Sequence, residues 1–172
     1  MLPEVAIRLI APAIDNTLSA QTWADLGCGS GTFTRALASV LPPSSHIHAI
    51  DQQQQSLPQQ FRNADIAFRQ ADFGQEPLLL NNLDGILLAN ALHYIKEAQS
   101  LLKRLSGYLT PGGRFLLVEY DRRRANRWVP YPISFEDAKE MFAAINFANI
   151  LKIDEQPSAY GQATLYSCVA SR

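Results

Sequence analysis

The run from Asp25 to Gly31 reads Asp-Leu-Gly-Cys-Gly-Ser-Gly, an acid followed by three alternating glycines. An apolar segment precedes this run and an amphipathic segment follows it, so the run is predicted to join a strand to a helix. Glycine has no side chain to hold a ligand away from the main chain, and it tolerates a positive φ. A tight structural turn is the alternative, but such a turn needs neither three glycines nor an acid. The pattern therefore predicts a loop that holds a nucleotide cofactor against its backbone.

The spacing of the glycines separates two classes of cofactor. The dinucleotide fingerprint Gly-x-Gly-x-x-Gly requires a third glycine at position 32, where this chain has Thr32. With Asp25 two residues before the first glycine, the run instead resembles motif I of the class I S-adenosylmethionine-dependent methyltransferases. The resemblance implies that Asp25 orders the loop and the amino-acid end of the cofactor. It also places four loop residues against the methionine part of the cofactor: Gly27, Cys28, Gly29 and Gly31.

Further polar residues close the predicted strands that follow. Asp51 lies about twenty residues beyond the glycine loop, where an acid on the neighbouring strand reaches the two hydroxyls of a ribose. In the family, the residue after this acid is often aliphatic and contacts adenine, whereas this chain has Gln52. The residues Asp72 and Phe73 resemble the motif that binds the edge of adenine. The alternative is that Asp72 is an ordinary loop residue and Phe73 belongs to the core.

Two later segments extend the resemblance, which covers residues 22–120. Residues 87–94 resemble motif IV and place Asn90 at the cofactor, and residues 109–119 resemble the turn and fifth strand of many small-molecule methyltransferases. The segment beginning at Asn90 reads Asn-Ala-Leu-His and not Asn-Pro-Pro-Tyr, which disfavours the amino-methyltransferases of DNA bases.

Methyl transfer to an oxygen or nitrogen requires that a proton leave the acceptor, so a base is expected. His93 is the candidate base because it follows Asn90 by three residues and its side chain titrates near neutral pH. The alternative is a histidine that begins a helix or faces solvent. Tyr94 is a candidate for orienting the substrate.

Residues 120–132 combine four arginines with aromatic residues and two prolines. One interpretation is a lid in which Tyr120, Trp128 and Tyr131 form aromatic walls and an arginine binds an anionic group such as a carboxylate. The other is a solvated basic loop anchored by one buried aromatic side chain.

Alternating strand-like and helix-like segments must position these residues. They predict one α/β domain over residues 1–172, with a doubly wound, seven-stranded, mostly parallel sheet and a C-terminal antiparallel hairpin. Residues 1–21 are expected to contain a helix that packs on this core. The predicted strands are 22–26, 47–50, 66–69, 84–89, 114–119, 150–154 and 164–170, with the last two joined through residues 159–162. The predicted helices are 33–41, 52–61, 96–108 and one that begins after Ser134.

Composition narrows the classes of function. A chain of 172 residues with 47% hydrophobic residues and a net charge of −1 is expected to fold as one globular domain and not to bind duplex nucleic acid or an anionic membrane surface. The two cysteines, Cys28 and Cys168, lack metal-ligand spacing, so we expect no metal and free thiols in the cytoplasm. Cys28 is near a helix N-terminus, and a packing role is favoured over a reactive thiol.

The sequence thus predicts an enzyme that moves a methyl group from S-adenosylmethionine to an O, N or C nucleophile of a small metabolite, releasing S-adenosylhomocysteine. Because little sequence surrounds the predicted core, the acceptor is expected to be partly exposed or to be enclosed by a second subunit in a homodimer. Two alternatives stay open. One is a methyltransferase-like domain that binds the cofactor or a partner without catalysis, and the other is an NAD(P)-dependent oxidoreductase, which Thr32 disfavours.

Overall fold

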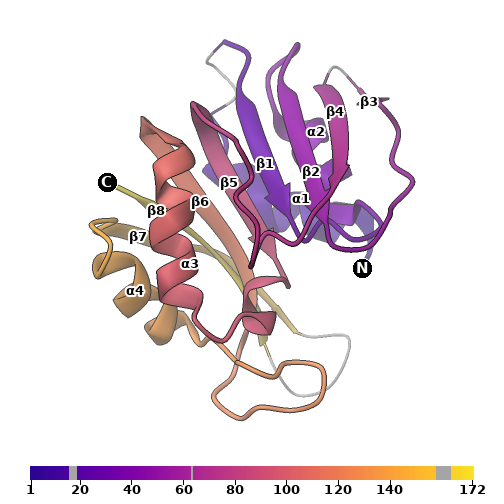
Figure 1. The fold of residues 1–172 in the computed structure, drawn as a ribbon. Helices are drawn as coiled ribbons and strands as arrows, with labels where there is room; N and C mark the ends of the chain where they lie inside the picture. The colour runs from indigo at the N-terminus through magenta and orange to yellow at the C-terminus, as the bar shows by residue number, and fades with distance from the viewer. Residues whose placement is uncertain (16–18, 63, 158–163) are drawn as a thin grey trace.

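The computed structural model describes residues 1–15, 19–62, 64–157 and 164–172. Within these ranges the chain forms one mixed sheet of eight strands in the order β3-β4-β2-β1-β5-β6-β8-β7 (Figure 1). The strands are β1 (Thr22–Leu26), β2 (His46–Asp51), β3 (Gln60–Phe61), β4 (Ala64–Gln70), β5 (Leu83–Ala89), β6 (Leu109–Asp121), β7 (Asn149–Pro157) and β8 (Thr164–Ser171). The α-helices are α1 (Pro3–Ile10), α2 (Thr32–Val40), α3 (Ala98–Leu105) and α4 (Phe135–Ala143), and the short 3-10 helices are η1 (Ala11–Ala13), η2 (Leu92–Tyr94) and η3 (Ser106–Tyr108).

The predicted doubly wound topology is confirmed. Strands β4, β2, β1, β5 and β6 run parallel to one another, and β8 pairs antiparallel with both β6 and β7. The last two strands therefore form the expected antiparallel hairpin. Its predicted connection through residues 159–162 lies outside the described residues.

The sheet has one strand more than predicted, and the predicted helix over residues 52–61 is wrong. Residues 52–59 have no regular secondary structure, and the two-residue strand β3 pairs antiparallel with β4 instead. Pro58 explains the difference, because proline disrupts a helix interior and favours an extended conformation at the preceding Leu57. Leu57 and Phe61 both pack against the core on the α2 side.

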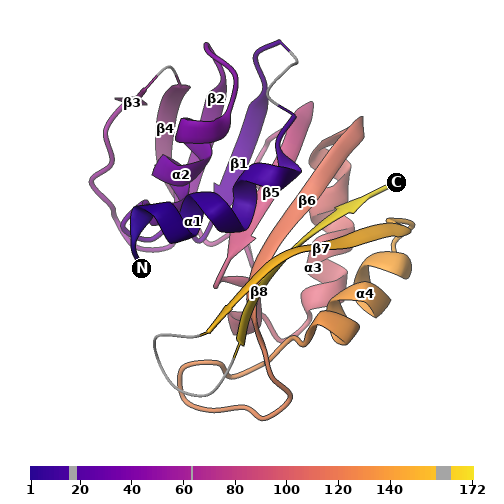
Figure 2. The same ribbon diagram turned by 180° about the vertical axis from the view of Figure 1, so that it is seen from behind.

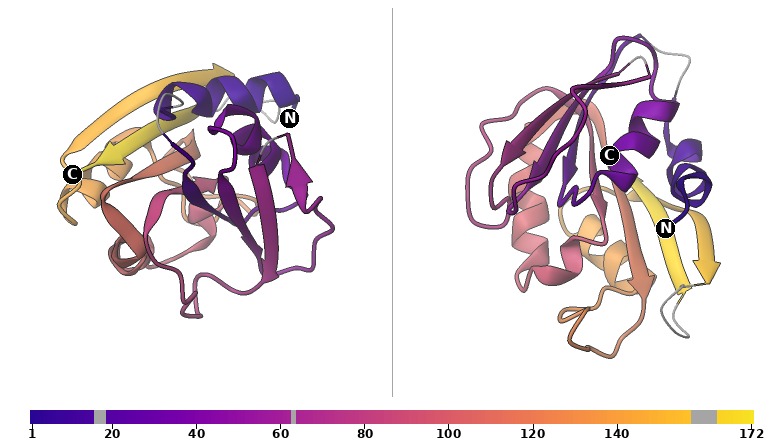
Figure 3. Two further views of the ribbon diagram at one scale, coloured as in Figure 1. Left: turned by 90° about the horizontal axis from the view of Figure 1, so that it is seen from above. Right: turned by 90° about the vertical axis from the view of Figure 1, so that its right-hand side faces the viewer.

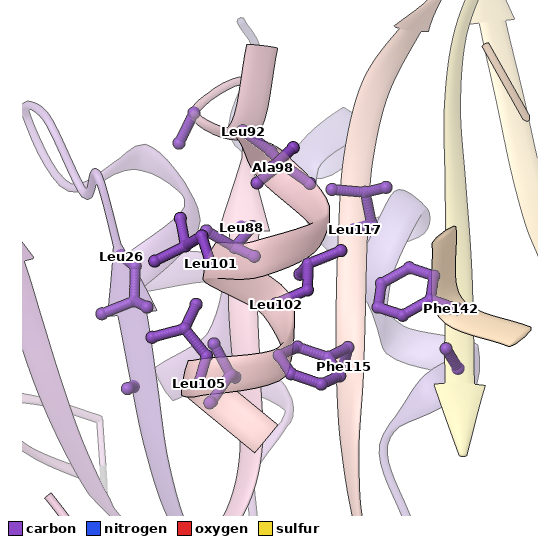
Figure 4. Packing of buried hydrophobic residues seen from close by; sticks show 14 of the residues in the cluster. Leu26, Leu88, Leu92, Ala98, Leu101, Leu102, Leu105, Phe115, Leu117 and Phe142 are labelled. Carbon is purple, nitrogen blue, oxygen red and sulfur yellow. The ribbon is translucent and has the colours of Figure 1, made fainter. Parts of the chain in front are cut away.

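Helices cover both faces of the sheet. Helices α3 and α4 lie on one face and α1 and α2 on the other (Figures 1 and 2). On β5, Leu88 belongs to the core beneath α3, and its neighbour Leu87 belongs to the core beneath α1 and α2. Figure 4 shows α3 placing Leu101 and Leu105 over the sheet. This burial on both faces explains the continuous apolar run of β5.

Local signals set the ends of two elements. Helix α4 begins after Ser134, as predicted, with a capping box in which the backbone N–H of Asp137 donates to Ser134 Oγ at 3.2 Å and the N–H of Ser134 donates to Asp137 Oδ2 at 2.9 Å. Residues 110–113, predicted as a turn, instead form an irregularity within β6, because Leu83 pairs with Leu109 while Gly85 pairs with Arg114. Seen from above and from the side, the sheet is twisted and has helices on both of its faces (Figure 3). Among the described residues, no helix is both long enough and apolar enough to cross a membrane.

Candidate functional site

The site lies at the carboxyl ends of the parallel strands. The strand order reverses between β1 and β5, with β2 and β4 on one side and β6 on the other. Open sheets of this type bind ligands at such a switch point. The predicted site residues Asp25, Asp51 and Asn90 come from the ends of β1, β2 and β5, so the topology brings them to this edge.

The glycine loop is bound to the end of β2. The backbone N–H groups of Gly27 and Cys28 donate to the carbonyl oxygen of Ile50, at 2.8 and 3.0 Å. The N–H of Gly29 donates to Asp51 Oδ2 at 2.8 Å. Gly27, Gly29 and Gly31 have φ angles of +78°, +50° and +81°, the left-handed region that glycine adopts without strain.

The three glycines differ in what surrounds them. A Cβ on Gly27 would lie 2.6 Å from the Cβ of Ala91, and a Cβ on Gly31 would lie 2.5 Å from Leu57 Cδ2. A Cβ on Gly29 would meet nothing within 4 Å. Close packing and backbone conformation therefore explain Gly27 and Gly31, whereas Gly29 leaves open space in which a ligand could approach the main chain. Gly31 is also the N-cap residue of α2 and is not among the residues that line the hollows below.

Asp25 is buried beneath this loop. Its side chain accepts a hydrogen bond of 2.6 Å from Thr34 Oγ1, and the residue is 1% exposed. Burial raises the pKa of Asp25 to about 7, an effect that the Thr34 hydrogen bond opposes and the nearby Asp51 increases. The thiol of Cys28 is also buried, and burial, followed by Asp25 and Asp51, raises its pKa. Cys28 is thus held as a protonated thiol, which fits the packing role.

Asp51 has free acceptor capacity despite two bonds to the backbone. Its Oδ2 accepts from Gly29, and its Oδ1 accepts from the N–H of Gln53 at 2.9 Å. Each carboxylate oxygen offers about two acceptor positions. A pair of ligand hydroxyls could therefore bind Asp51 without breaking the bonds that hold the loop. The next residue, Gln52, accepts a hydrogen bond at its carbonyl oxygen from Gln70 Nε2 at 3.0 Å.

Asp72 and Phe73 follow β4 beside a groove of about 580 Å³. Asp72 Oδ1 accepts from the N–H of Gly74 at 2.9 Å, and the N–H of Asp72 donates to Glu76 Oε1 at the same distance. Asp72 is therefore a loop residue, as the alternative interpretation expects, and it also lines the groove. Phe73 likewise belongs to the core and lines the groove. The groove is lined by Gly27, Gly29, Asp51, Gln52, Gln53, Gln55, Asp72, Phe73, Gln75, Asn90, Ala91, Tyr94 and Ile95.

Asn90 connects this groove to two other hollows. One has a volume of about 270 Å³ and lies beside Asp25, Cys28 and Gly29, and the other is described below. Asn90 has a φ of +53°, and its buried Oδ1 has no hydrogen-bond partner in the described part of the chain. Leaving a buried acceptor unsatisfied costs about 1–3 kcal/mol. A ligand that donates a hydrogen bond at the junction of the three hollows would remove this cost.

A pocket of about 420 Å³ adjoins the junction on the side of β6. Its walls include Tyr94, Tyr120 and Trp128, and Tyr94 and Trp128 are 57% and 64% exposed. Eight described residues line it: Asn90, His93, Tyr94, Tyr120, Arg122, Asn126, Trp128 and Val129. Tyr131 is not among them. Its backbone N–H instead donates to the carbonyl oxygen of His93 at 3.0 Å, which attaches the loop after β6 to η2.

His93 is buried in η2 and lines this pocket, so the interpretation as a solvent-facing histidine is wrong. Its Nδ1 lies 2.6 Å from Oε2 of Glu119, a side chain that is also fully buried. Oε1 of Glu119 accepts from the N–H groups of Leu92 and His93 at 3.0 and 3.2 Å. Glu119 thus both caps the start of η2 and binds the imidazole.

Glu119 was not predicted as a site residue, because its position in the sequence indicated only the end of the strand 114–119. A usable signal was present. Glu119 ends an apolar run, as Asp25 and Asp51 do, and the carboxyl ends of all these strands meet at one edge of the sheet.

Comparisons with known proteins identify the family and the fold of this chain. Residues 24–115 match the family model described as a methyltransferase domain. An uncharacterized methyltransferase of Mycobacterium tuberculosis is 32% identical over 106 residues, which cover 60% of this chain and 52% of that protein. The chain therefore spans about half the length of the curated relatives that it matches.

Solved structures share the fold. The YcgJ protein of Bacillus subtilis has a TM-score of 0.72 at 12% identity, covering 98% of this chain and 99% of its own. The 1,6-didemethyltoxoflavin-N1-methyltransferase of Burkholderia thailandensis, solved with 1,6-didemethyltoxoflavin and S-adenosylhomocysteine, has a TM-score of 0.69 at 19% identity. That match covers 98% of this chain and 80% of the Burkholderia chain.

Proposed function

The chain belongs to the family of S-adenosylmethionine-dependent methyltransferase domains of class I, and from this premise we propose that it transfers the methyl group of this cofactor to an O, N or C nucleophile of a small molecule. The observation that carries the proposal is the position of Asn90. Asn90 lines the groove and hollow of the glycine loop and also the separate aromatic pocket, and its buried side-chain oxygen has no partner in the part of the chain that the structure describes. A two-substrate reaction requires such a junction, because the two ligands must meet there.

The residues of the groove suit the adenosine part of the cofactor. Asp51 retains acceptor capacity for the ribose hydroxyls, and Asp72 and Phe73 offer an acceptor and an apolar surface for adenine. The smaller hollow suits the amino-acid end, because Asp25 and the Asn90 oxygen are acceptors for an ammonium group. The open space at Gly29 lets the ligand lie against the backbone between them.

The aromatic pocket suits the acceptor. When bound, S-adenosylmethionine supplies a methyl group on a sulfonium sulfur, which keeps the electron pair of the C–S bond as S-adenosylhomocysteine forms. The protein then needs to hold a nucleophile near that methyl group and exclude water, and correct placement alone is worth roughly 7–11 kcal/mol. Tyr94, Tyr120 and Trp128 supply surfaces that would hold a small molecule in this way.

A catalytically silent binding domain is the alternative that keeps the same cofactor groove. The second pocket and the buried pair of His93 and Glu119 favour catalysis over binding alone, because cofactor binding uses neither. We also propose a small-molecule acceptor and not a nucleic acid, because the net charge of −1 gives no general attraction for phosphates.

The test is incubation of the protein with methyl-labelled S-adenosylmethionine and a metabolite extract from cells. We expect label in one or a few small molecules, together with S-adenosylhomocysteine. Replacing Asn90 by aspartate removes the amide donor but keeps the acceptor at the junction, whereas replacing it by leucine removes both. The leucine variant should therefore lose methyl transfer, and the aspartate variant should retain more transfer activity than the leucine variant. Binding of the cofactor without transfer to any metabolite would favour the silent domain.

A further inference from the structure

The buried pair of His93 and Glu119 has a geometry that fixes the state of the imidazole. Oε1 of Glu119 accepts from two backbone N–H groups, and its Oε2 lies 2.6 Å from the imidazole Nδ1. A carboxylate is an acceptor only, so the short contact requires a proton on Nδ1. In neutral imidazole the other nitrogen, Nε2, then carries a lone pair. His93 lines the aromatic pocket. Because Glu119 occupies the Nδ1 edge of the ring, we infer that a ligand meets the Nε2 edge.

The walls of the pocket define the shape of that ligand. The ring of His93 lies 4.3 Å from the ring of Tyr94 and 6.2 Å from that of Tyr120, measured between centroids. Trp128 adds a third aromatic surface. Flat aromatic walls favour a planar ligand, because stacked or tilted rings gain contact over their whole faces.

The charges of the pocket define the chemistry of the ligand. Arg122 is the one permanent cation among the described lining residues, and no carboxylate is among them. The Arg122 side chain is half-buried, and its Nε donates to the carbonyl oxygen of Arg124 at 2.8 Å, whereas its terminal nitrogens make no hydrogen bond to the described residues. A guanidinium in this setting pairs well with a carboxylate.

We propose that the acceptor is a planar hydroxy acid that is methylated on its hydroxyl oxygen, with Arg122 binding its carboxylate, His93 accepting its proton and Glu119 acting as a positioning residue for His93. This inference rests on the proposed methyl transfer and specifies its acceptor. In the step, a C–O bond forms as the C–S bond breaks with its electron pair on sulfur. The hydroxyl proton passes to His93 Nε2 and then to solvent, so charge and atoms balance.

A merely structural role for Glu119 makes a different prediction. As a cap of η2 alone, Glu119 would hold the turn that carries Asn90, and its loss would damage every acceptor equally. As a positioning residue, it matters most when the acceptor still carries a proton. Replacing Glu119 by glutamine separates these roles, because the glutamine oxygen can still cap η2 while its amide group donates toward Nδ1 and moves the imidazole proton to Nε2.

The experiment uses three planar phenols as acceptors: 4-hydroxybenzoate, its 3-nitro derivative, whose hydroxyl is ionised at neutral pH, and 4-hydroxybenzamide, which has no carboxylate. Wild-type protein should methylate both hydroxybenzoates on the phenolic oxygen and disfavour the benzamide. Glu119→Gln should lower kcat for 4-hydroxybenzoate by about a hundredfold or more, a typical contribution of a general base, with little change in KM. The loss should be much smaller for the nitro derivative. Glu140→Gln, the same charge change at an exposed position, is the matched control and should change neither.

Two further measurements keep the proposal falsifiable if Glu119→Gln does not fold. His93→Asn keeps a donor in the place of Nδ1 but removes Nε2, so it should show the same selective loss. In ¹⁵N NMR of the wild-type protein, the His93 signal should report a proton on Nδ1, and a proton on Nε2 would overturn the proposal. Equal losses for all acceptors, or no methylation of either hydroxybenzoate by protein that binds S-adenosylhomocysteine, would also overturn it. Absence of S-adenosylhomocysteine binding would instead contradict the proposed function itself.

Discussion

Replacement of Asp25 by asparagine should stabilise the protein above neutral pH. Burial raises the pKa of Asp25 from 3.8 to about 7, so the folded state holds a proton on this group that the unfolded state has already released. Stability is then full below the unfolded pKa, falls as pH rises between about 4 and 7, and is constant above that range. The shift of about 3 pKa units corresponds to a loss of about 4 kcal/mol in the free energy of unfolding.

Asparagine removes this pH dependence because its amide does not ionise, and its oxygen can still accept the hydrogen bond from Thr34. Between pH 5 and pH 8 the wild-type protein should lose about 3 kcal/mol relative to Asp25→Asn, from the two pH units that lie within the titration range. Urea denaturation of both proteins at the two pH values measures this difference. Asp65→Asn, which removes a carboxylate from an exposed position on β4, is the control.

A stability difference between wild type and Asp25→Asn that is the same at pH 5 and pH 8 would refute the reasoning. It would mean that the buried carboxyl does not change its protonation between these values. Asp65→Asn should show no comparable change, so a parallel response of the control would trace the effect to net charge and not to burial.

Three substitutions test the ligand sites. Gly29→Val should abolish binding of S-adenosylhomocysteine in calorimetry, because the new side chain would fill the open space left for the ligand and would strain a positive φ. Gly112→Val is the control, since Gly112 also faces open space but lies outside the site, and this variant should bind normally. Asp51→Ala should weaken binding by about tenfold to a hundredfold, the worth of charge-assisted hydrogen bonds, and unchanged affinity in a folded variant would place the ribose elsewhere. Trp128→Ala should reduce methylation of the acceptor while cofactor affinity stays nearly constant, and unaltered kinetics would reject an acceptor role for this loop.

Residues at strand ends were predictable from the sequence. Asp25, Asp51 and Asn90 each close an apolar segment, and parallel strands bring such ends to one edge of the sheet, so local patterns sufficed to group them. The contact between His93 and Glu119 joins residues 26 positions apart, one in η2 and the other near the end of β6, and no local periodicity encodes the pairing of two such side chains.

Other features depended on long-range packing. The roles of Gly27 and Gly31 are set by Ala91 and Leu57, which are distant in sequence, so the glycine pattern alone did not distinguish them from Gly29. The helix predicted over residues 52–61 is wrong for a local reason, because Pro58 would lie in its interior and favours an extended conformation at Leu57.

Calorimetric titration of the wild-type protein with S-adenosylhomocysteine and, separately, with NAD and NADP tests the central claim most directly. The open backbone at Gly29, the free acceptor capacity of Asp51 and the Asn90 oxygen, which has no partner among the described residues, predict binding of S-adenosylhomocysteine. Thr32, at the position of the third glycine of the dinucleotide fingerprint, predicts no binding of either dinucleotide. Tight binding of NAD or NADP without binding of S-adenosylhomocysteine would contradict the assignment of the groove and the proposed methyl transfer with it.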